Sequence, residues 1–143
     1  MIRIKAVDAQ NILDVCALTS GREGAAEGCP GCNAVSIAEA KYNPELHPNA
    51  IYSNNALIGF FMYERAEDHA GTATLLRFMV DGRFQSKGLE EKALERVLRG
   101  LKIQGVKRVI LTDGGAKGLY LSFGFRPAGE TGEPGCRYEL DLE

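Results

Sequence analysis

One segment, from Arg77 to Leu101, limits the folds open to this chain more than any other; its sequence is RFMVDGRFQSKGLEEKALERVLRGL. The largely apolar run over 72–81 predicts a strand, and apolar residues at helical spacing predict a helix over 87–103. A basic, glycine-containing turn joins the two. Backbone N–H groups and a helix N-terminus therefore meet where the strand ends, and such a place holds anions, phosphates above all.

The remaining sequence predicts alternating strands and helices. Strands are expected at 2–7, 50–53, 56–65, 106–112, 125–128 and 136–142, helices at 9–18, 34–42 and 115–123, and loops at 20–33 and 43–49. Asn54 and Asn55 suit the positive φ that a tight hairpin requires. Asn33 is a candidate helix N-cap, and Gly124 is a candidate helix end.

The order of these elements predicts the fold class. A helix between the strands at 72–81 and 106–112 favours a parallel crossover, whereas the earlier hairpins favour antiparallel pairing. We therefore predict an α/β fold with one mixed, mostly antiparallel sheet and helices on both faces. The 143 residues are expected to form a single domain, 1–143, around one core.

The net charge and the hydropathy of the chain limit the classes of partner that it can bind. The formal charge is −2 with no basic tail, which argues against nucleic acid. No apolar run approaches the roughly 20 residues of a membrane span, and the N-terminus lacks the apolar region of a signal peptide. We therefore expect a cytoplasmic protein that binds neither nucleic acid nor membrane.

Two of the four cysteines, Cys29 and Cys32, form a C-x-x-C motif. Zinc would need two further ligands, for which the candidates are Cys16, Cys136 and His47. The proline and glycine between the two cysteines favour a turn that brings the thiols together, so a reversible disulfide is a second interpretation. The third is a pair of reduced thiols in a glycine-rich loop. The spacing offers no second cysteine pair, so we assign no metal site.

The strand-turn-helix segment and a later one resemble a known family. RFMVDGRFQSKGLEEKALE, followed by LYLSFGFRPAGE, resembles the GCN5-related N-acetyltransferases (GNAT), and within them the polyamine or diamine N-acetyltransferases. In that branch the first segment typically runs R-F-x-[IV]-D-x-R-[FY]-Q-G-x-G-[YF]-G. The second runs N-x-x-A-x-x-L-Y-x-x-L-G-F. The resemblance covers most of the chain outside 20–33 and implies an acyl-CoA N-acyltransferase-like fold.

The resemblance implies transfer of an acetyl group from acetyl-CoA to a primary amine of a small molecule, a polyamine being one candidate. Tyr120 matches the tyrosine that protonates the departing CoA thiolate as general acid. Phe78, Met79 and Val80 would lie beside the pantetheine arm. The implied contacts of the cofactor's phosphate end are Arg83, Gln85, Ser86, Lys87, Gly88, Leu89, Glu90 and Asp113. The same resemblance favours a homodimer.

The chain departs from the family pattern at three places. Glu90 stands where the family has a glycine, and its carboxylate either repels the phosphates or turns outward in the first helical turn. Asp113 stands where the family has an asparagine, and an aspartate cannot donate through its side chain. The segment 20–33 falls in the region that covers the acceptor site in this family.

These departures leave two interpretations of function. The first is an acetyl-CoA-dependent N-acetyltransferase. The second is a ligand-binding or sensing module of the same fold with impaired transfer, using the Cys29/Cys32 loop. Candidate ligands for a cationic amine, which are also ordinary solvated acids, are Glu39, Glu45 and Glu64. His47 is a candidate base or an exposed loop histidine.

Overall fold

The fold is described from a computed structural model that covers residues 1–19, 33–69, 71–111, 117–128 and 137–142. In chain order the strands and helices are β1 (Ile2–Ala6), α1 (Ile12–Ala17), α2 (Asn33–Tyr42), β2 (Leu46–Ser53), β3 (Ala56–Glu64), β4 (Thr72–Val80), α3 (Leu89–Ile103), β5 (Arg108–Leu111), α4 (Lys117–Ser122), β6 (Arg126–Ala128) and β7 (Arg137–Asp141). Two 3₁₀ helices, η1 (Glu67–His69) and η2 (Gly82–Lys87), flank β4.

The described strands form one seven-stranded sheet in the order β1-β2-β3-β4-β5-β7-β6. Within the described strands, β4 and β5 pair in parallel and the other neighbours pair antiparallel. This confirms the predicted mixed, mostly antiparallel sheet, and α3 is the crossover between its two parallel strands. Each helix in the described residues is too short or too polar to cross a membrane.

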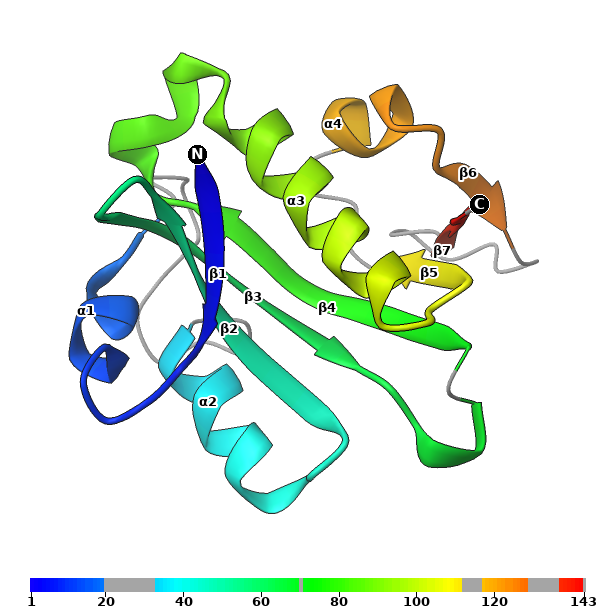
Figure 1. The fold of residues 1–143 in the computed structure, drawn as a ribbon, viewed down its shortest axis with the longest axis horizontal. Helices are drawn as coiled ribbons and strands as arrows, with labels where there is room; N and C mark the ends of the chain where they lie inside the picture. Colours follow the sequence, from blue (N-terminus) through cyan, green and yellow to red (C-terminus); the bar gives the residue numbers. More distant parts are fainter. Residues whose placement is uncertain (20–32, 70, 112–116, 129–136, 143) are drawn as a thin grey trace.

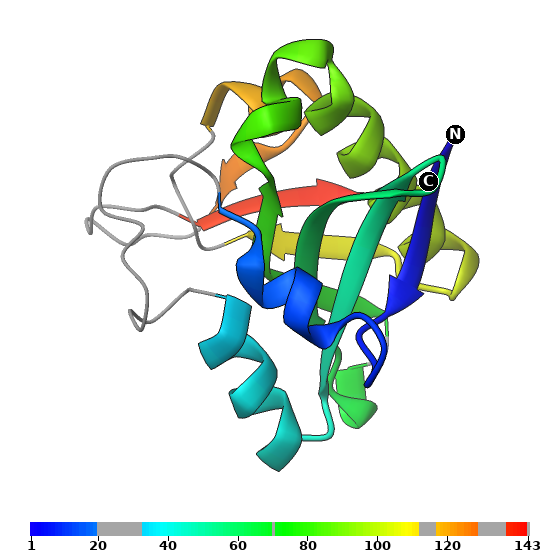
Figure 2. The ribbon, with the colours of Figure 1, turned by 90° about the vertical axis from the view of Figure 1, so that its left-hand side faces the viewer.

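Helices cover both faces of the sheet, as predicted (Figures 1 and 2). On one face α1 and α2 enclose a small core around Val15, Phe60 and Met62. On the other face α3 and α4 pack on the larger core, which includes Leu75, Leu94 and Tyr120. The stripe of α3 that the sequence predicted is buried here, and Glu95 pairs with Arg99 at 3.3 Å on its outer face.

The predicted loop over 43–49 is wrong in its second half, because β2 begins at Leu46 and contains Pro48. Pro48 is tolerated because of where it lies in the sheet. Its carbonyl accepts from the Val7 N–H at 3.2 Å, on the side of β2 that faces β1. The missing N–H of Pro48 points to that same side, just beyond the last β1–β2 pair, Ala6–Asn49. Pro48 therefore costs only the return hydrogen bond of this terminal pair, from its missing N–H to the Val7 carbonyl.

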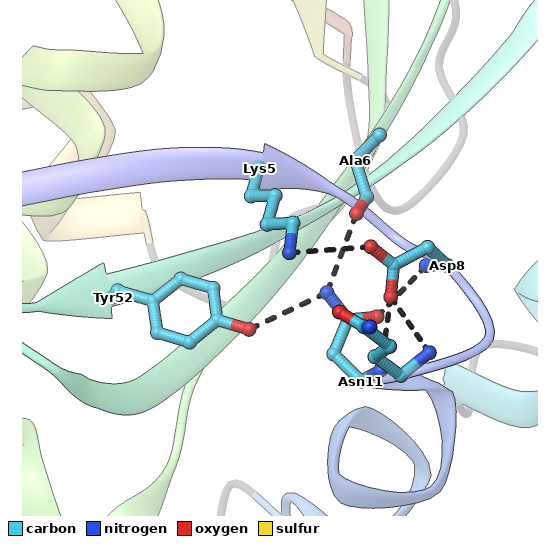
Figure 3. Close-up of polar contacts among 6 residues, drawn as sticks. Lys5, Ala6, Asp8, Asn11 and Tyr52 are labelled. Carbon is cyan, nitrogen blue, oxygen red and sulfur yellow. Dashed lines mark hydrogen bonds and ion pairs between the residues drawn. The ribbon is translucent and has the colours of Figure 1, made fainter.

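A carboxylate fixes the entry of the chain into α1 (Figure 3). Asp8 accepts from the N–H groups of Gln10 at 2.9 Å and Asn11 at 3.0 Å, and it pairs with Lys5 at 3.3 Å. Asn11 in turn donates to the Ala6 carbonyl. At the second helix, Asn33 is the first helical residue rather than a preceding N-cap, and its amide donates to the Val15 carbonyl at 2.9 Å.

Candidate functional site

The sheet opens between β4 and β5. Their parallel pairing runs from Thr72–Arg108 to Leu75–Leu111 and stops there in the described part of the chain. Beyond Leu75, β3 is the partner of β4 as far as Val80 within the described residues. The edge of β4 that faces away from β3 thus offers extended backbone groups to a ligand at the end where the anion-binding turn begins.

A β-bulge marks the point of divergence. Met62 lies opposite Arg77 and Tyr63 lies opposite Leu75, so Leu76 is an extra residue in β4. The bulge bends the strand as its parallel partner is lost. The Leu76 carbonyl accepts from Arg77 Nη1 at 2.8 Å. The bulge also shifts the alternation of side chains, so that Leu76 packs towards α1 and α2 whereas Phe78, two residues further on, packs towards α3.

The three strand residues implicated by the sequence lie at the free end of β4. Phe78 and Val80 pack into the core under α3, and Met79 packs into the core under α1 and α2. Opposite them, Gly59 of β3 lets the two backbones approach closely. A side chain on Gly59 would overlap the Met79 carbonyl oxygen and lie 3.3 Å from the Val80 Cα.

The predicted turn after β4 is a 3₁₀ helix, η2, and the following helix starts at Leu89 instead of the predicted 87. Gly88 separates the two, since its φ of +70° lies in the left-handed region that favours glycine. Gln85 donates from Nε2 to the Val80 carbonyl at 2.7 Å and so fastens the turn to the strand. By helix geometry the first N–H groups of α3 have no i−4 carbonyl within the helix, and α3 starts directly after this turn.

Asp81 is a site residue to which the sequence reasoning gave no role. Its buried carboxylate accepts from the Arg83 N–H at 3.0 Å, from Arg83 Nε at 2.8 Å and from the Thr19 N–H at 3.1 Å. An aspartate followed by glycine at the end of a strand is the sequence signal for such a turn. Arg83, a predicted cofactor contact, is held by this ion pair while its side chain stays 72% exposed.

Burial alone would raise the pKa of Asp81, but the hydrogen bonds from the Arg83 side chain and backbone and from the Thr19 backbone outweigh it and lower that pKa. The ionised carboxylate therefore stabilises the fold above about pH 4, and this stabilisation disappears as the pH falls from there through the lower folded pKa.

We expect Asp81→Asn to reduce the free energy of unfolding by about 2 kcal/mol at pH 7, because a buried charge-assisted network loses its acceptor. The difference from wild type should begin to shrink below about pH 4, where the unfolded carboxylate becomes neutral, and should shrink further as the pH falls through the lowered pKa of the folded carboxylate. Urea unfolding of both proteins at pH 7 and at pH 3 measures this. An equal difference at the two pH values would contradict it.

The first turn of α3 is acidic. Glu90, at the family's glycine position, is half-buried, whereas Glu91 is exposed. Glu91 turns back over the helix start: its Oε2 lies 3.7 Å from where a side chain on Gly88 would begin. A carboxylate at this third helical position stabilises the helix N-terminus. It also occupies the neighbourhood in which a phosphate would bind.

Tyr120 lies on α4 and is 3% exposed. Its ring packs edge-on against Phe125, with centroids 5.7 Å apart, and Gly124 ends the helix with a φ of +96° as predicted. Tyr120 belongs to the same continuous core as Leu75, Val80 and Leu111, the residues around the opening between β4 and β5. The opening, the turn and this tyrosine are therefore the parts of the candidate site.

The candidate amine ligands do not gather in one place. Glu39 pairs with Arg77 at 3.8 Å. Glu45 accepts from the Glu67 N–H at 3.4 Å, and Glu64 lies opposite Thr74, both at the end of the sheet away from the turn. His47 stacks on Tyr63 with centroids 4.9 Å apart.

Several sequence predictions lie outside the described residues, namely those for Asp113, Cys29, Cys32 and Cys136 and for the side chains of Ser86 and Lys87. Among the residues that the structure does describe, no group of three or more His, Cys, Asp or Glu side chains could hold a metal ion. The interpretations of the C-x-x-C motif therefore stay predictions.

Comparison with known proteins agrees with this geometry. The sequence profile of the acetyltransferase (GNAT) family matches residues 23–125. The spermine/spermidine N(1)-acetyltransferase of Bacillus subtilis is 35% identical over 106 residues, which make up 67% of this chain and 70% of that relative.

Solved structures share the fold across the whole chain. An acetyltransferase from Thermus thermophilus superposes with a TM-score of 0.76 at 20% identity, over 99% of this chain and 97% of that one. The PaiA N-acetyltransferase of Thermoplasma acidophilum, in complex with coenzyme A, superposes with a TM-score of 0.67 at 16% identity, over 99% of both chains. With the family profile and the Bacillus relative, they lead to one conclusion: the chain belongs to the GNAT family, whose members use acetyl-CoA, and it is an N-acetyltransferase.

Proposed function

We propose that the chain transfers the acetyl group of acetyl-CoA to a primary amine of a small polyamine. The proposal rests on the opening between β4 and β5, which begins at the Leu76 bulge. The opening leads to the start of α3, which Gly88 precedes. The 35% identity with a spermine/spermidine N(1)-acetyltransferase supports the polyamine class.

In this proposal the cofactor binds along the free edge of β4. Amide groups of the pantetheine arm pair with the backbone over Phe78 to Val80, as a further strand would. The diphosphate lies against the N–H groups at the start of α3, beside Gly88, where it has to displace the Glu91 carboxylate. Arg83 adds positive charge, and Gln85 holds the turn on the strand.

The amine reaches the thioester from the face of α1 and α2. The segment that joins α1 to α2 in sequence matches the region that covers the acceptor site in the family. The neutral amine nitrogen attacks the thioester carbonyl carbon, the C–S bond breaks, and the CoA thiolate takes the proton of the Tyr120 hydroxyl. The amide nitrogen loses its extra proton to water, and solvent returns a proton to Tyr120.

Incubation of the purified protein with acetyl-CoA and either spermidine or n-butylamine tests the proposal. We expect CoA release and N-acetylspermidine by mass spectrometry, with kcat/KM for spermidine at least about tenfold above that for the monoamine, a difference of ~1.4 kcal/mol. Transfer to both amines at equal efficiency would remove the polyamine class. No transfer to either amine, with acetyl-CoA bound, would favour the sensing module.

The acidic first turn of α3 should weaken cofactor binding. We expect Glu90→Gln to tighten acetyl-CoA binding about two- to fivefold at low salt, since a charge at a helix terminus is worth ~0.3–1 kcal/mol. The gain should shrink in 0.5 M salt, where the Debye length is only about 4 Å. Calorimetric titration at both salt concentrations measures it.

Glu67→Gln is the matched control, because it removes the same charge in η1, at the other end of β4. Equal acetyl-CoA affinities of the Glu90 and Glu67 variants would contradict the proposed repulsion between the Glu90 carboxylate and the cofactor.

A further inference from the structure

Asp81 joins three parts of the chain, namely β3, the turn in which it lies and the segment that follows α1. Its own N–H donates to the Ile58 carbonyl of β3 at 2.7 Å. Its Oδ1 binds Arg83 in the cofactor turn, and its Oδ2 binds the Thr19 N–H at 3.1 Å. The Thr19 carbonyl accepts from the Gly82 N–H at 2.9 Å, so both backbone groups of Thr19 are held by the start of the turn.

Thr19 lies on the face from which the amine would arrive. It follows α1 directly, and the neighbouring Leu18 packs into the core under α1 and α2. Arg83, on the other side of the same carboxylate, belongs to the turn that would hold the diphosphate. A single buried side chain thus lies between the amine side and the cofactor side of the site.

We propose that Asp81 is a positioning residue that couples the two substrate sites, so that each substrate strengthens the binding of the other. This rests on the function proposed above. A ligand that orders the turn around Arg83 also orders Thr19 through the shared carboxylate. The second ligand then binds a site that the first ligand has already ordered, so its own binding no longer carries the entropy cost of that ordering. By linkage, the factor by which the cofactor raises amine affinity equals the factor by which the amine raises cofactor affinity.

The negative charge of Asp81 allows an experiment to distinguish this coupling role from a purely structural role. Its negative charge lies beside the turn and neutralises Arg83, so removing the charge favours the binding of an anion. Asp81→Asn should therefore leave CoA affinity unchanged or higher while it weakens amine binding. A residue that only holds the fold together would weaken both.

Calorimetric titrations with CoA and spermidine, which cannot react together, test the coupling at a temperature where every variant is folded. In the wild type we expect each ligand to raise the affinity of the other at least about fivefold, the lower end of typical coupling. In Asp81→Asn this factor should fall to about 1, with the KM for spermidine raised and the Kd for CoA not raised.

A second variant removes only the bond to Thr19. Thr19→Pro deletes the N–H that donates to Asp81 and leaves Arg83 in place. Proline is compatible with the preceding residue, because the backbone of Leu18, with φ −67° and ψ 143°, is already extended. It should abolish the coupling as Asp81→Asn does, and the double variant should show no further loss. Thr19→Ala keeps the N–H and should keep the coupling.

Asp8→Asn is the matched control, because Asp8 is another aspartate that accepts two backbone N–H groups and pairs with a cation, at the start of α1 (Figure 3). It should keep the wild-type coupling. The proposal is overturned if the wild type shows transfer without coupling, or if Asp81→Asn or Thr19→Pro retains the wild-type factor. Wild-type protein that binds no CoA would overturn the proposed function as well, which separates the two failures.

Discussion

Tyr120→Phe should lower kcat for acetyl transfer by about 10²–10⁴, the usual contribution of a positioned general acid. The substitution removes one oxygen and keeps the ring, whose edge-on contact with Phe125 and burial in the core of α3 and α4 hold it in place. Because the proton is needed only as the C–S bond breaks, the affinity for acetyl-CoA should change little. Steady-state kinetics and a binding titration on the same preparation measure both quantities.

Tyr63→Phe is the control for the loss of a tyrosine hydroxyl. Tyr63 is also buried, and its hydroxyl donates to Gln104 Oε1 at 3.2 Å, at the far end of α3 from the site. This variant should keep the wild-type rate. If Tyr120→Phe kept that rate too, Tyr120 would be only the packed core residue that its burial also allows.

Gly59→Ala should destabilise the protein by about 3 kcal/mol, at the upper end of what overpacking costs. The new methyl group would overlap the Met79 carbonyl oxygen, and that neighbour is backbone, which cannot rotate away. β3 and β4 would have to separate where the cofactor is proposed to bind. We therefore expect a lower midpoint of thermal unfolding and a higher KM for acetyl-CoA.

Gly71→Ala is the matched control for Gly59→Ala. A side chain at Gly71 would meet no atom within 4 Å. The substitution should leave the stability within about 0.5 kcal/mol of wild type, as for most surface changes. A Gly59 variant as stable as the Gly71 variant would show that β3 can shift without cost and would contradict the close packing of the two strands.

The parts of the fold that local chemistry dictates could be predicted from the sequence. The apolar stripe of α3 needs only helical spacing, and Asn54, with a φ of +56°, forms the hairpin for which its small polar side chain is suited. The left-handed Gly124 after α4 is a similar case. Each depends on neighbours a few residues away.

The parts of the fold that depend on segments distant in sequence could not be predicted from the sequence. Pro48 lies in a strand because it stands at the end of the β1–β2 ladder, where its missing N–H costs a single terminal hydrogen bond. The Leu76 bulge exists only in the pairing of β3 with β4. The role of Asp81 can be recognised only in the fold, where the N–H of Thr19, which is distant in sequence, donates to its carboxylate. The family motif thus located the turn and Tyr120, while the residue that ties the turn to the rest of the site needed the fold.

The central claim, that the opening of the sheet and the start of α3 hold acetyl-CoA, is tested most directly by thermal unfolding with and without the cofactor. Acetyl-CoA at 100 times its dissociation constant stabilises the fold by ~2.7 kcal/mol. For a chain of this size that raises the midpoint by roughly 5–10 °C. No shift at millimolar acetyl-CoA would contradict the account.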